Sequence, residues 1–432
     1  MIITQHSKVL LAAVMTLGVL AVQPQSVSEE SSFELPAIKI VRENEIGGRK
    51  VIRYEHDSMS QWGYEKPQKD WFNLIPPKKP VKDSPLCVVL HSAGGNGDET
   101  IPAICTPHDR NFYGDDTFYV LCLDCATNRN DWWWGNEEIE RHPDLYKSEF
   151  CPAEKRVLST IEWVIRTFGI DRNRVYLNGV SMGGSGSLGI GLIHGDIFAA
   201  VSVVVPAGVK HMKFRTLNRK FPEPPPLFDI SSHIDSWALG QEELMTYFKE
   251  NKYFLSFAWG TFGHTANVSP ANPAAYEYPY LTIRKNEAYP VFTNATTDNH
   301  YPGLTNSTAP DQSGQINGYF RWKNIEDTAK SFVMELRLVK KDELRRPIEI
   351  PKESVADITP RRLQKFTVSK GAGYSWSMTC ADKVLQSGKA TADANGVLTI
   401  PTVKISDSPS CLKIVQDTET AKPSPATQLP EK

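Results

Sequence analysis

A serine between two glycines is the residue best placed for nucleophilic chemistry in this sequence. The segment Gly179-Val180-Ser181-Met182-Gly183 follows the apolar run 175–177 and precedes a stretch rich in glycine and other small residues. Glycines on both sides permit a sharp turn from a strand into a helix, and this turn holds the hydroxyl at the positive end of the helix. In this context we predict that Ser181 is a nucleophile, with a glycine-rich structural turn as the alternative.

A nucleophilic serine needs a base, and the base needs an acid that orients it. Where a serine of this kind acts as a nucleophile, the acid and then the histidine follow it along the chain. Asp229 lies within the apolar run 227–230, and Asp235 lies in the turn that follows. Placement in a turn favours Asp235 as the acid. Its alternative role is to cap the N-terminus of the next helix.

The predicted base is His264, which lies in a glycine-flanked turn after the apolar run 254–257. Its place in the order serine, acid, histidine supports this role. His300 is the second candidate for the base, and His233 and His211 are weaker ones.

The attacked carbonyl develops negative charge, which backbone N–H groups can stabilise. The segment 91–97, His-Ser-Ala-Gly-Gly-Asn-Gly, ends a short apolar run and resembles loops that supply one such donor. We expect the N–H of Ser92 or of Ala93 to be that donor, and the sequence does not decide between them. The second expected donor is the N–H of Met182, and His91 is expected to hold the loop in place.

Tryptophans near the predicted acid, the predicted base and one loop are candidates for substrate contacts. Three of them are consecutive in the loop 130–136, and three neighbouring side chains cannot all face one core. At least one is therefore expected to be exposed as a stacking surface for a sugar or an aromatic ring. An aromatic plug under the loop is the alternative. The five candidates are Trp132, Trp133, Trp134, Trp237 and Trp259.

The elements that position these residues follow from the apolar pattern. Short apolar runs without alternation are typical of strands buried on both faces of a parallel sheet. They cover residues 86–90, 118–123, 175–177, 199–205, 227–230 and 254–257. Helical patterns between them cover residues 153–168, 183–193 and 241–251. This alternation predicts an α/β fold, a mostly parallel sheet with helices on both faces.

The character of the chain changes after residue 267, where helical patterns disappear. We predict one α/β domain over residues 30–345, whose part after 267 is a strand- and loop-rich extension. A linker precedes residues 352–416, where short strand patterns and turn residues predict a small β-sandwich module. The polar tail 417–432 is predicted to be disordered.

The N-terminus predicts export. Residues 1–25 carry a lysine, a short apolar run and a polar exit, as in a signal peptide, and an uncleaved anchor is the alternative. We therefore expect a secreted or periplasmic protein without stable membrane insertion after cleavage. The seven cysteines suit an exported protein with some disulfides, and Cys380 with Cys411 is one possible pair. A net charge of −2 gives no support for a nucleic-acid partner.

Three motifs together resemble the polyhydroxybutyrate depolymerase and feruloyl/acetylxylan esterase group, which has the α/β-hydrolase fold. They are the segments 91–97, Asp171-Arg-Asn-Arg-Val-Tyr-Leu-Asn-Gly-Val-Ser-Met-Gly-Gly and Gly263-His264-Thr265. The resemblance covers roughly residues 70–270 and implies ester hydrolysis by a Ser-Asp-His triad without a metal or cofactor. Ser92 and the stretch 267–345 depart from the group's pattern, which leaves the substrate open.

These observations predict a secreted serine hydrolase that cleaves carboxylic esters. The expected substrates are acetyl, feruloyl or other acyl groups on polysaccharides, or small aromatic esters. One alternative is a serine peptidase of the prolyl-oligopeptidase-like type. Another is a catalytically inactive carbohydrate-binding protein on the same scaffold.

Overall fold

The computed structural model describes most of the chain after residue 36. The described ranges are 37–106, 110–135, 150–211, 215, 222–309 and 312–417. The expected signal peptide and all but the first residue of the expected disordered tail lie outside these ranges. Within them, no helix is both long enough and apolar enough to cross a membrane.

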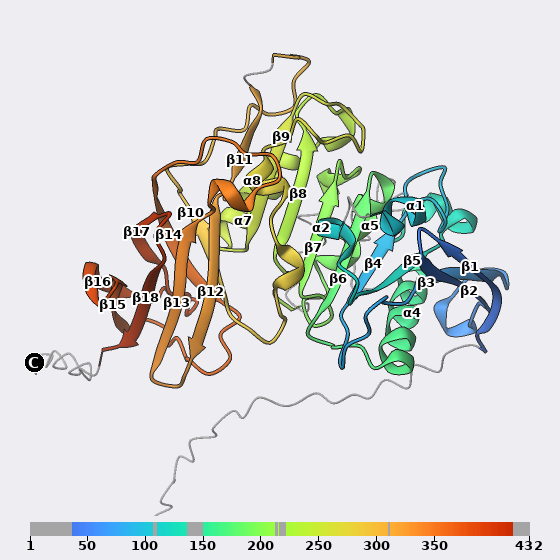
Figure 1. Ribbon diagram of the computed structural model, residues 1–432, viewed down its shortest axis with the longest axis horizontal. Coiled ribbons are helices and arrows are strands. Elements are labelled where there is room, and N and C mark those ends of the chain that lie inside the picture. Colours follow the sequence, from blue (N-terminus) through green and yellow to red (C-terminus); the bar gives the residue numbers. More distant parts are fainter. Residues whose placement is uncertain are drawn as a thin grey trace, which may run out of the picture. The chain divides into compact units, whose positions relative to one another are not determined.

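A ten-stranded sheet forms the centre of the α/β part, in the order β1-β2-β3-β5-β4-β6-β7-β8-β9-β11 (Figure 1). Its strands are β1 (Lys39–Ile46), β2 (Arg49–Asp57), β3 (Lys69–Ile75), β4 (Leu86–Leu90), β5 (Tyr119–Leu123), β6 (Val175–Val180), β7 (Ala200–Val204), β8 (Leu227–Ser232), β9 (Leu255–Gly260) and β11 (Gly314–Ile316). The strands from β5 to β9 in this order run parallel, and the edge strands are antiparallel. All six predicted apolar runs lie in the parallel part, so the mostly parallel sheet is confirmed.

The long helices cover one face of this sheet. They are α4 (Pro152–Phe168), α5 (Met182–Gly191) and α7 (Gln241–Glu250), and they pack on the face that holds alternate residues of β4 such as Leu86 and Val88. The opposite face holds Cys87 and Val89, among the short helices α1 (Ile101–Cys105) and η7 (Tyr280–Thr282). In the described ranges no long helix packs there. The expectation of helices on both faces therefore holds fully for one face only.

The remaining short helices lie in the connections. They are α2 (Arg110–Tyr113), α8 (Pro273–Tyr276), η1 (Ser60–Trp62), η3 (Ala126–Asp131), η5 (Val209–His211), η6 (Ser236–Ala238) and η9 (Lys341–Glu343).

Two smaller antiparallel sheets follow in the C-terminal part. The first has the order β10 (Tyr289–Thr293), β14 (Glu353–Arg361), β17 (Ile400–Ser406), and the second has the order β12 (Phe320–Asp327), β13 (Ser331–Leu338), β18 (Ser410–Gln416), β15 (Gly373–Cys380), β16 (Lys383–Thr391). Both sheets combine strands from before and after the predicted linker. The predicted boundary between residues 345 and 352 is therefore wrong, because hydrogen-bonded pairing joins residues 289–338 to the strands that follow.

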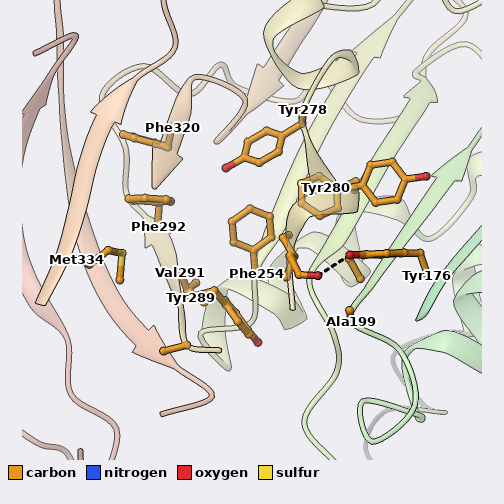
Figure 2. Packing of buried hydrophobic residues seen from close by; sticks show 14 of the residues in the cluster. Tyr176, Ala199, Phe254, Tyr278, Tyr280, Tyr289, Val291, Phe292, Phe320 and Met334 are labelled. Atoms are coloured by element: carbon orange, nitrogen blue, oxygen red, sulfur yellow. Dashed lines mark hydrogen bonds between the residues drawn. The ribbon is translucent and has the colours of Figure 1, made fainter. Parts of the chain in front are cut away.

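The second face of the large sheet shares one hydrophobic core with these antiparallel strands. Figure 2 shows Tyr176 and Tyr280 on one side of Phe254, with Phe292 and Phe320 on the other. The rings of Phe292 and Phe320 stack with their centroids 4.1 Å apart. Aromatic side chains and antiparallel strands thus occupy the space that we expected helices to fill.

All seven cysteines lie in the described ranges, and the expected disulfides are not formed among them in this structure. Thr379, not Cys380, lies opposite Cys411 in the pairing of β15 with β18. Cys380, the suggested disulfide partner of Cys411, is therefore one residue away from the position that faces Cys411. Cys87 and Cys122 are buried in strands β4 and β5, as their apolar surroundings predicted.

Candidate active site

Ser181 occupies the turn between β6 and α5. Its backbone has φ 56° and ψ −117°. Residues other than glycine rarely adopt this backbone conformation, which is typical of strained functional turns. A Cβ on Gly179 would overlap the backbone of Gly183, and a Cβ on Gly183 would overlap the carbonyl group of Leu90. The two flanking residues must therefore be glycines for the strand and the helix to approach this closely.

The three predicted triad residues are brought together by the structure. Ser181 Oγ lies 2.7 Å from His264 Nε2, and His264 Nδ1 lies 2.6 Å from Asp235 Oδ2. A carboxylate can only accept here, so His264 Nδ1 carries the proton and Nε2 is left to accept from the serine. The Asp235 side chain is 1% exposed and that of His264 is 30% exposed. The imidazole is therefore anchored on its buried side and accessible on the other.

Asp235 uses its two oxygens for two different contacts. Oδ2 holds His264, and Oδ1 accepts a hydrogen bond of 3.0 Å from the backbone N–H of Trp237 as the N-cap of η6. The two roles that the sequence left as alternatives are both present in the geometry. The hydrogen bond to the helical turn holds the Asp235 carboxylate in the orientation in which it contacts the imidazole.

Ser232 positions the turn that carries His264, a role that the sequence analysis missed. Its hydroxyl donates to the Gly260 carbonyl at 3.0 Å and accepts from the Gly263 N–H at 2.9 Å. The two bonds span the turn immediately before the histidine. Nothing in the local sequence indicates this role, because β8 and the end of β9 meet only in the folded sheet.

The other acid and base candidates lie elsewhere. Asp229 is buried in β8, where Ser231 Oγ donates to it at 2.7 Å and Gln241 Nε2 donates to its second oxygen. Burial raises the pKa of Asp229 to about 6. His233 is buried and His300 is exposed beside a separate cavity. The side chain of His211 lies outside the described part of the structure.

The loop after β4 is tied to the serine turn. His91 Nε2 accepts from the N–H of Cys125 at 2.9 Å, so its proton is on Nδ1, which donates to the Ser92 carbonyl at 2.8 Å. The Ser92 hydroxyl donates to the Val180 carbonyl at 3.1 Å. His91 thus braces the loop as expected, and Ser92 links that loop to the residue before Ser181.

Glu99 distinguishes between the two expected oxyanion donors of this loop. The N–H of Ser92 donates to Glu99 Oε2 at 2.9 Å and is therefore occupied. Among the described residues the N–H of Ala93 has no acceptor, and the N–H of Met182 lies in the first turn of α5, where backbone amides lack a helical partner. Of the three expected donors, the N–H groups of Ala93 and Met182 are therefore the two that have no acceptor among the described residues. Glu99 is a second residue that the sequence analysis missed.

Two of the five predicted tryptophans lie beside the triad. The ring of Trp237 is 6.1 Å from that of His264 and 5.8 Å from that of Trp132, measured between centroids. Trp237 is 51% exposed and Trp132 is partly buried. Together they form an accessible aromatic surface next to the imidazole.

The other three tryptophans are buried, so their predicted role in substrate binding is wrong. Trp133 donates to the His91 carbonyl at 3.4 Å, and Trp134 donates to Ser185 Oγ at 3.0 Å. Both rings pack on α5, against helical glycines that leave room for them. Trp259 is buried in β9 and donates to the Gln312 carbonyl at 2.6 Å.

A serine on a strand–turn–helix elbow, followed along the chain by an aspartate and a histidine that reach it, is the arrangement of the α/β-hydrolase fold. No protein-family model matches the sequence. No curated protein matches it.

Solved structures similar to this chain include serine hydrolases and esterases. An S-formylglutathione hydrolase from Agrobacterium tumefaciens is 14% identical, with a TM-score of 0.40 over 52% of this chain and 92% of that chain. The fluorophosphonate-binding serine hydrolase FphF from Staphylococcus aureus is 13% identical, with a TM-score of 0.37 over 49% of this chain and 91% of that chain. A ferulic acid esterase is 10% identical, with a TM-score of 0.35 over 50% of this chain and 93% of that chain.

Proposed function

We propose that this protein hydrolyses carboxylic esters, with Ser181 as the nucleophile, His264 as the general base and acid, and Asp235 as the residue that orients His264. The observation that carries the proposal is the continuous hydrogen-bond chain from Ser181 Oγ through the imidazole to a buried carboxylate. A serine hydroxyl is a weak nucleophile until a positioned base removes its proton. In this hydrogen-bonded arrangement the imidazole of His264 is that base.

The reaction follows from the geometry in two halves. Ser181 Oγ attacks the ester carbonyl carbon while His264 Nε2 takes its proton, and the carbonyl oxygen becomes an oxyanion. Collapse of this tetrahedral intermediate expels the alcohol, which receives the proton from His264, and leaves an acyl group on Ser181. Water then attacks the acyl group while His264 Nε2 takes one of its protons. Collapse of the second tetrahedral intermediate breaks the bond to Ser181 Oγ, which receives the proton back from His264, and the carboxylic acid leaves.

The N–H groups of Ala93 and Met182 are the proposed oxyanion donors. They come from the loop after β4 and the first turn of α5, which meet at Ser181. Removal of one donor of this kind typically costs about 10²–10³ in kcat. Glu99 acts as a positioning residue in this account, because its carboxylate engages the neighbouring Ser92 N–H.

The aromatic pair Trp132 and Trp237 supports a substrate with a flat or ring-shaped group near the ester. An exposed tryptophan face binds sugar rings and aromatic acyl groups through the same apolar contact. We therefore infer that the substrates are acetyl, feruloyl or related esters, including esters on polysaccharides. We also propose that the N-terminal segment is a signal peptide that directs export of the protein. We propose further that the two antiparallel sheets form a β-sandwich.

The test compares the wild type with Ser181→Ala in the hydrolysis of p-nitrophenyl acetate. We expect turnover to fall to background without unfolding, because the nucleophile alone is removed. Ser187→Ala is the matched control: it removes a buried hydroxyl from helix α5, which follows Ser181, and this hydroxyl has no partner in the described structure. Wild-type turnover that survives in Ser181→Ala contradicts the proposal.

The substrate class is tested by presenting acetylated and feruloylated oligosaccharides beside matched peptide amides. The proposal predicts that esters are cleaved and that amides are cleaved far more slowly. Preferential cleavage of amides favours a serine peptidase instead. Binding of glycans without cleavage of any ester favours an inactive carbohydrate-binding protein.

A further inference from the structure

The aromatic pair beside His264 continues into an exposed apolar surface. Trp237 is 51% exposed, and Leu239, two residues further along the chain, is 54% exposed. Leu304 is 41% exposed. These three are among the large apolar side chains that the described part of the structure leaves accessible. Together with the partly buried Trp132 they form a surface that we call the apolar patch.

The residues on either side of Leu304 hold it beside the acid turn. The N–H of Thr305 donates to the carbonyl of His233 at 2.8 Å. A Cβ on Gly303 would lie 3.0 Å from Glu242 Oε1. Leu304 is therefore fixed against the segment that connects β8 to the first turn of α7, and this segment also carries the acid and the exposed tryptophan.

The apolar patch begins at the catalytic imidazole. The ring centroids of Trp237 and His264 are 6.1 Å apart. Single exposed apolar side chains are common on protein surfaces, whereas a group of them marks a binding site. The molecule that reaches this imidazole in every turnover is the ester. The occupant that this position selects is therefore a part of the substrate.

The reaction determines which part of the ester lies there. His264 Nε2 gives its proton to the oxygen of the leaving alcohol, so this oxygen lies within hydrogen-bond distance of the imidazole. The carbonyl oxygen instead faces the proposed donors, the N–H groups of Ala93 and Met182, in the loop after β4 and in α5. The part of the ester beside the imidazole, and hence nearest to Trp237, is the alcohol.

The side chains of the apolar patch favour a hydrocarbon. Leu239 and Leu304 cannot hydrogen-bond to the hydroxyl groups of a sugar. Each methylene group that is fully removed from water strengthens binding by about fourfold. A surface of this kind therefore distinguishes a long alkyl alcohol from methanol by a large factor.

We propose that the apolar patch binds the alcohol part of the ester, and that the enzyme favours esters of hydrocarbon alcohols over esters of sugars. This inference rests on the proposed esterase function and narrows its substrates. The alcohol leaves in the first half of the reaction, before the acyl-enzyme is hydrolysed. The apolar patch therefore raises kcat/KM and has no effect on hydrolysis of the acyl-enzyme.

Isomeric esters separate the alcohol from the acyl group. Methyl acetate is extended on the alcohol side to butyl and hexyl acetate, and on the acyl side to methyl pentanoate and methyl heptanoate. Butyl acetate and methyl pentanoate are isomers, as are hexyl acetate and methyl heptanoate. Titration of the released acid at constant pH gives kcat/KM for the full-length protein. We expect kcat/KM to rise at least about tenfold from methyl to hexyl acetate, and less than about threefold from methyl acetate to methyl heptanoate.

Two substitutions locate the effect. Trp237→Ala and Leu239→Ala should each lower the ratio of kcat/KM for hexyl acetate to kcat/KM for methyl acetate at least about fivefold. The ratio is the readout because a variant that only disturbs the acid turn lowers both values alike. Leu385→Ala is the matched control: Leu385 is 50% exposed in β16 of the five-stranded sheet, and its substitution should leave the ratio unchanged.

The inference is overturned if kcat/KM does not rise along the alcohol series, if it rises equally along the acyl series, or if both variants keep the wild-type ratio. More efficient cleavage of an acetylated xylo-oligosaccharide than of hexyl acetate also overturns it, because the alcohol site would then prefer a sugar. In all these cases esters are cleaved and the proposed function stands. If neither p-nitrophenyl acetate nor methyl acetate is cleaved, the proposed function fails and this inference fails with it.

Discussion

At the scale of single residues, the choice between two aspartates shows what the sequence can and cannot provide. The rule that the acid lies in a turn selected Asp235, and His264 Nδ1 is 2.6 Å from its Oδ2. Glu99 and Ser232 escaped notice because their roles are hydrogen bonds to backbone amides, which leave no pattern in the chain.

The two aspartates also give a sharp test. Asp235→Asn should reduce kcat by about 10⁴-fold, since an amide at this position favours the wrong imidazole tautomer. Asp229→Asn is the control, because Asp229 is buried in the same strand region and contacts Ser231 and Gln241 rather than the histidine. Steady-state kinetics on p-nitrophenyl acetate measures both. Equal losses in the two variants would show that the acid has been wrongly assigned.

At the scale of elements, the glycine-rich helix α5 explains why the tryptophan prediction was only partly right. The sequence of three consecutive tryptophans does not reveal which rings are buried. Their burial is decided by contacts with helix α5. Cβ atoms on Gly186 and Gly189 would overlap the rings of Trp133 and Trp134. Small residues in this helix therefore serve the packing of a distant loop. The strands were easier to predict, because buried parallel strands are apolar throughout.

Gly189→Ala tests this packing. The added methyl group meets the ring of Trp134, and overpacking of this kind costs about 1–3 kcal/mol of stability. Urea denaturation should show a lower midpoint than in the wild type. Ser187→Ala in the same helix adds no atoms and should leave the midpoint unchanged or higher. Helix propensity alone would make Gly189→Ala more stable by up to about 1 kcal/mol, so increased stability contradicts the packing account.

At the scale of the whole molecule, the described residues do not separate into a hydrolase and an appended module. The aromatic residues Tyr278, Tyr280 and Tyr289 lie in one hydrophobic core with strands from the C-terminal part. The sequence could not show this, because the pairing of β10 with β14 joins residues about 70 apart and the turn pattern near residue 345 resembles a linker.

Truncation after residue 345 tests this shared core. Such a chain loses β14 and β18, which pair with β10 and β13. We expect it to aggregate or to be degraded, and we expect the full chain to unfold in one calorimetric transition. A truncated chain that folds and retains esterase activity would restore the two-domain interpretation.

The central claim is that Ser181 is a nucleophile activated by His264, and covalent labelling tests it most directly. The full-length protein is treated with a fluorophosphonate probe, digested and mapped by mass spectrometry. The account predicts a single adduct on the peptide that contains Ser181, strongly reduced labelling in His264→Ala and none in Ser181→Ala. An unlabelled wild-type protein, or an adduct on another residue that persists in Ser181→Ala, would contradict it.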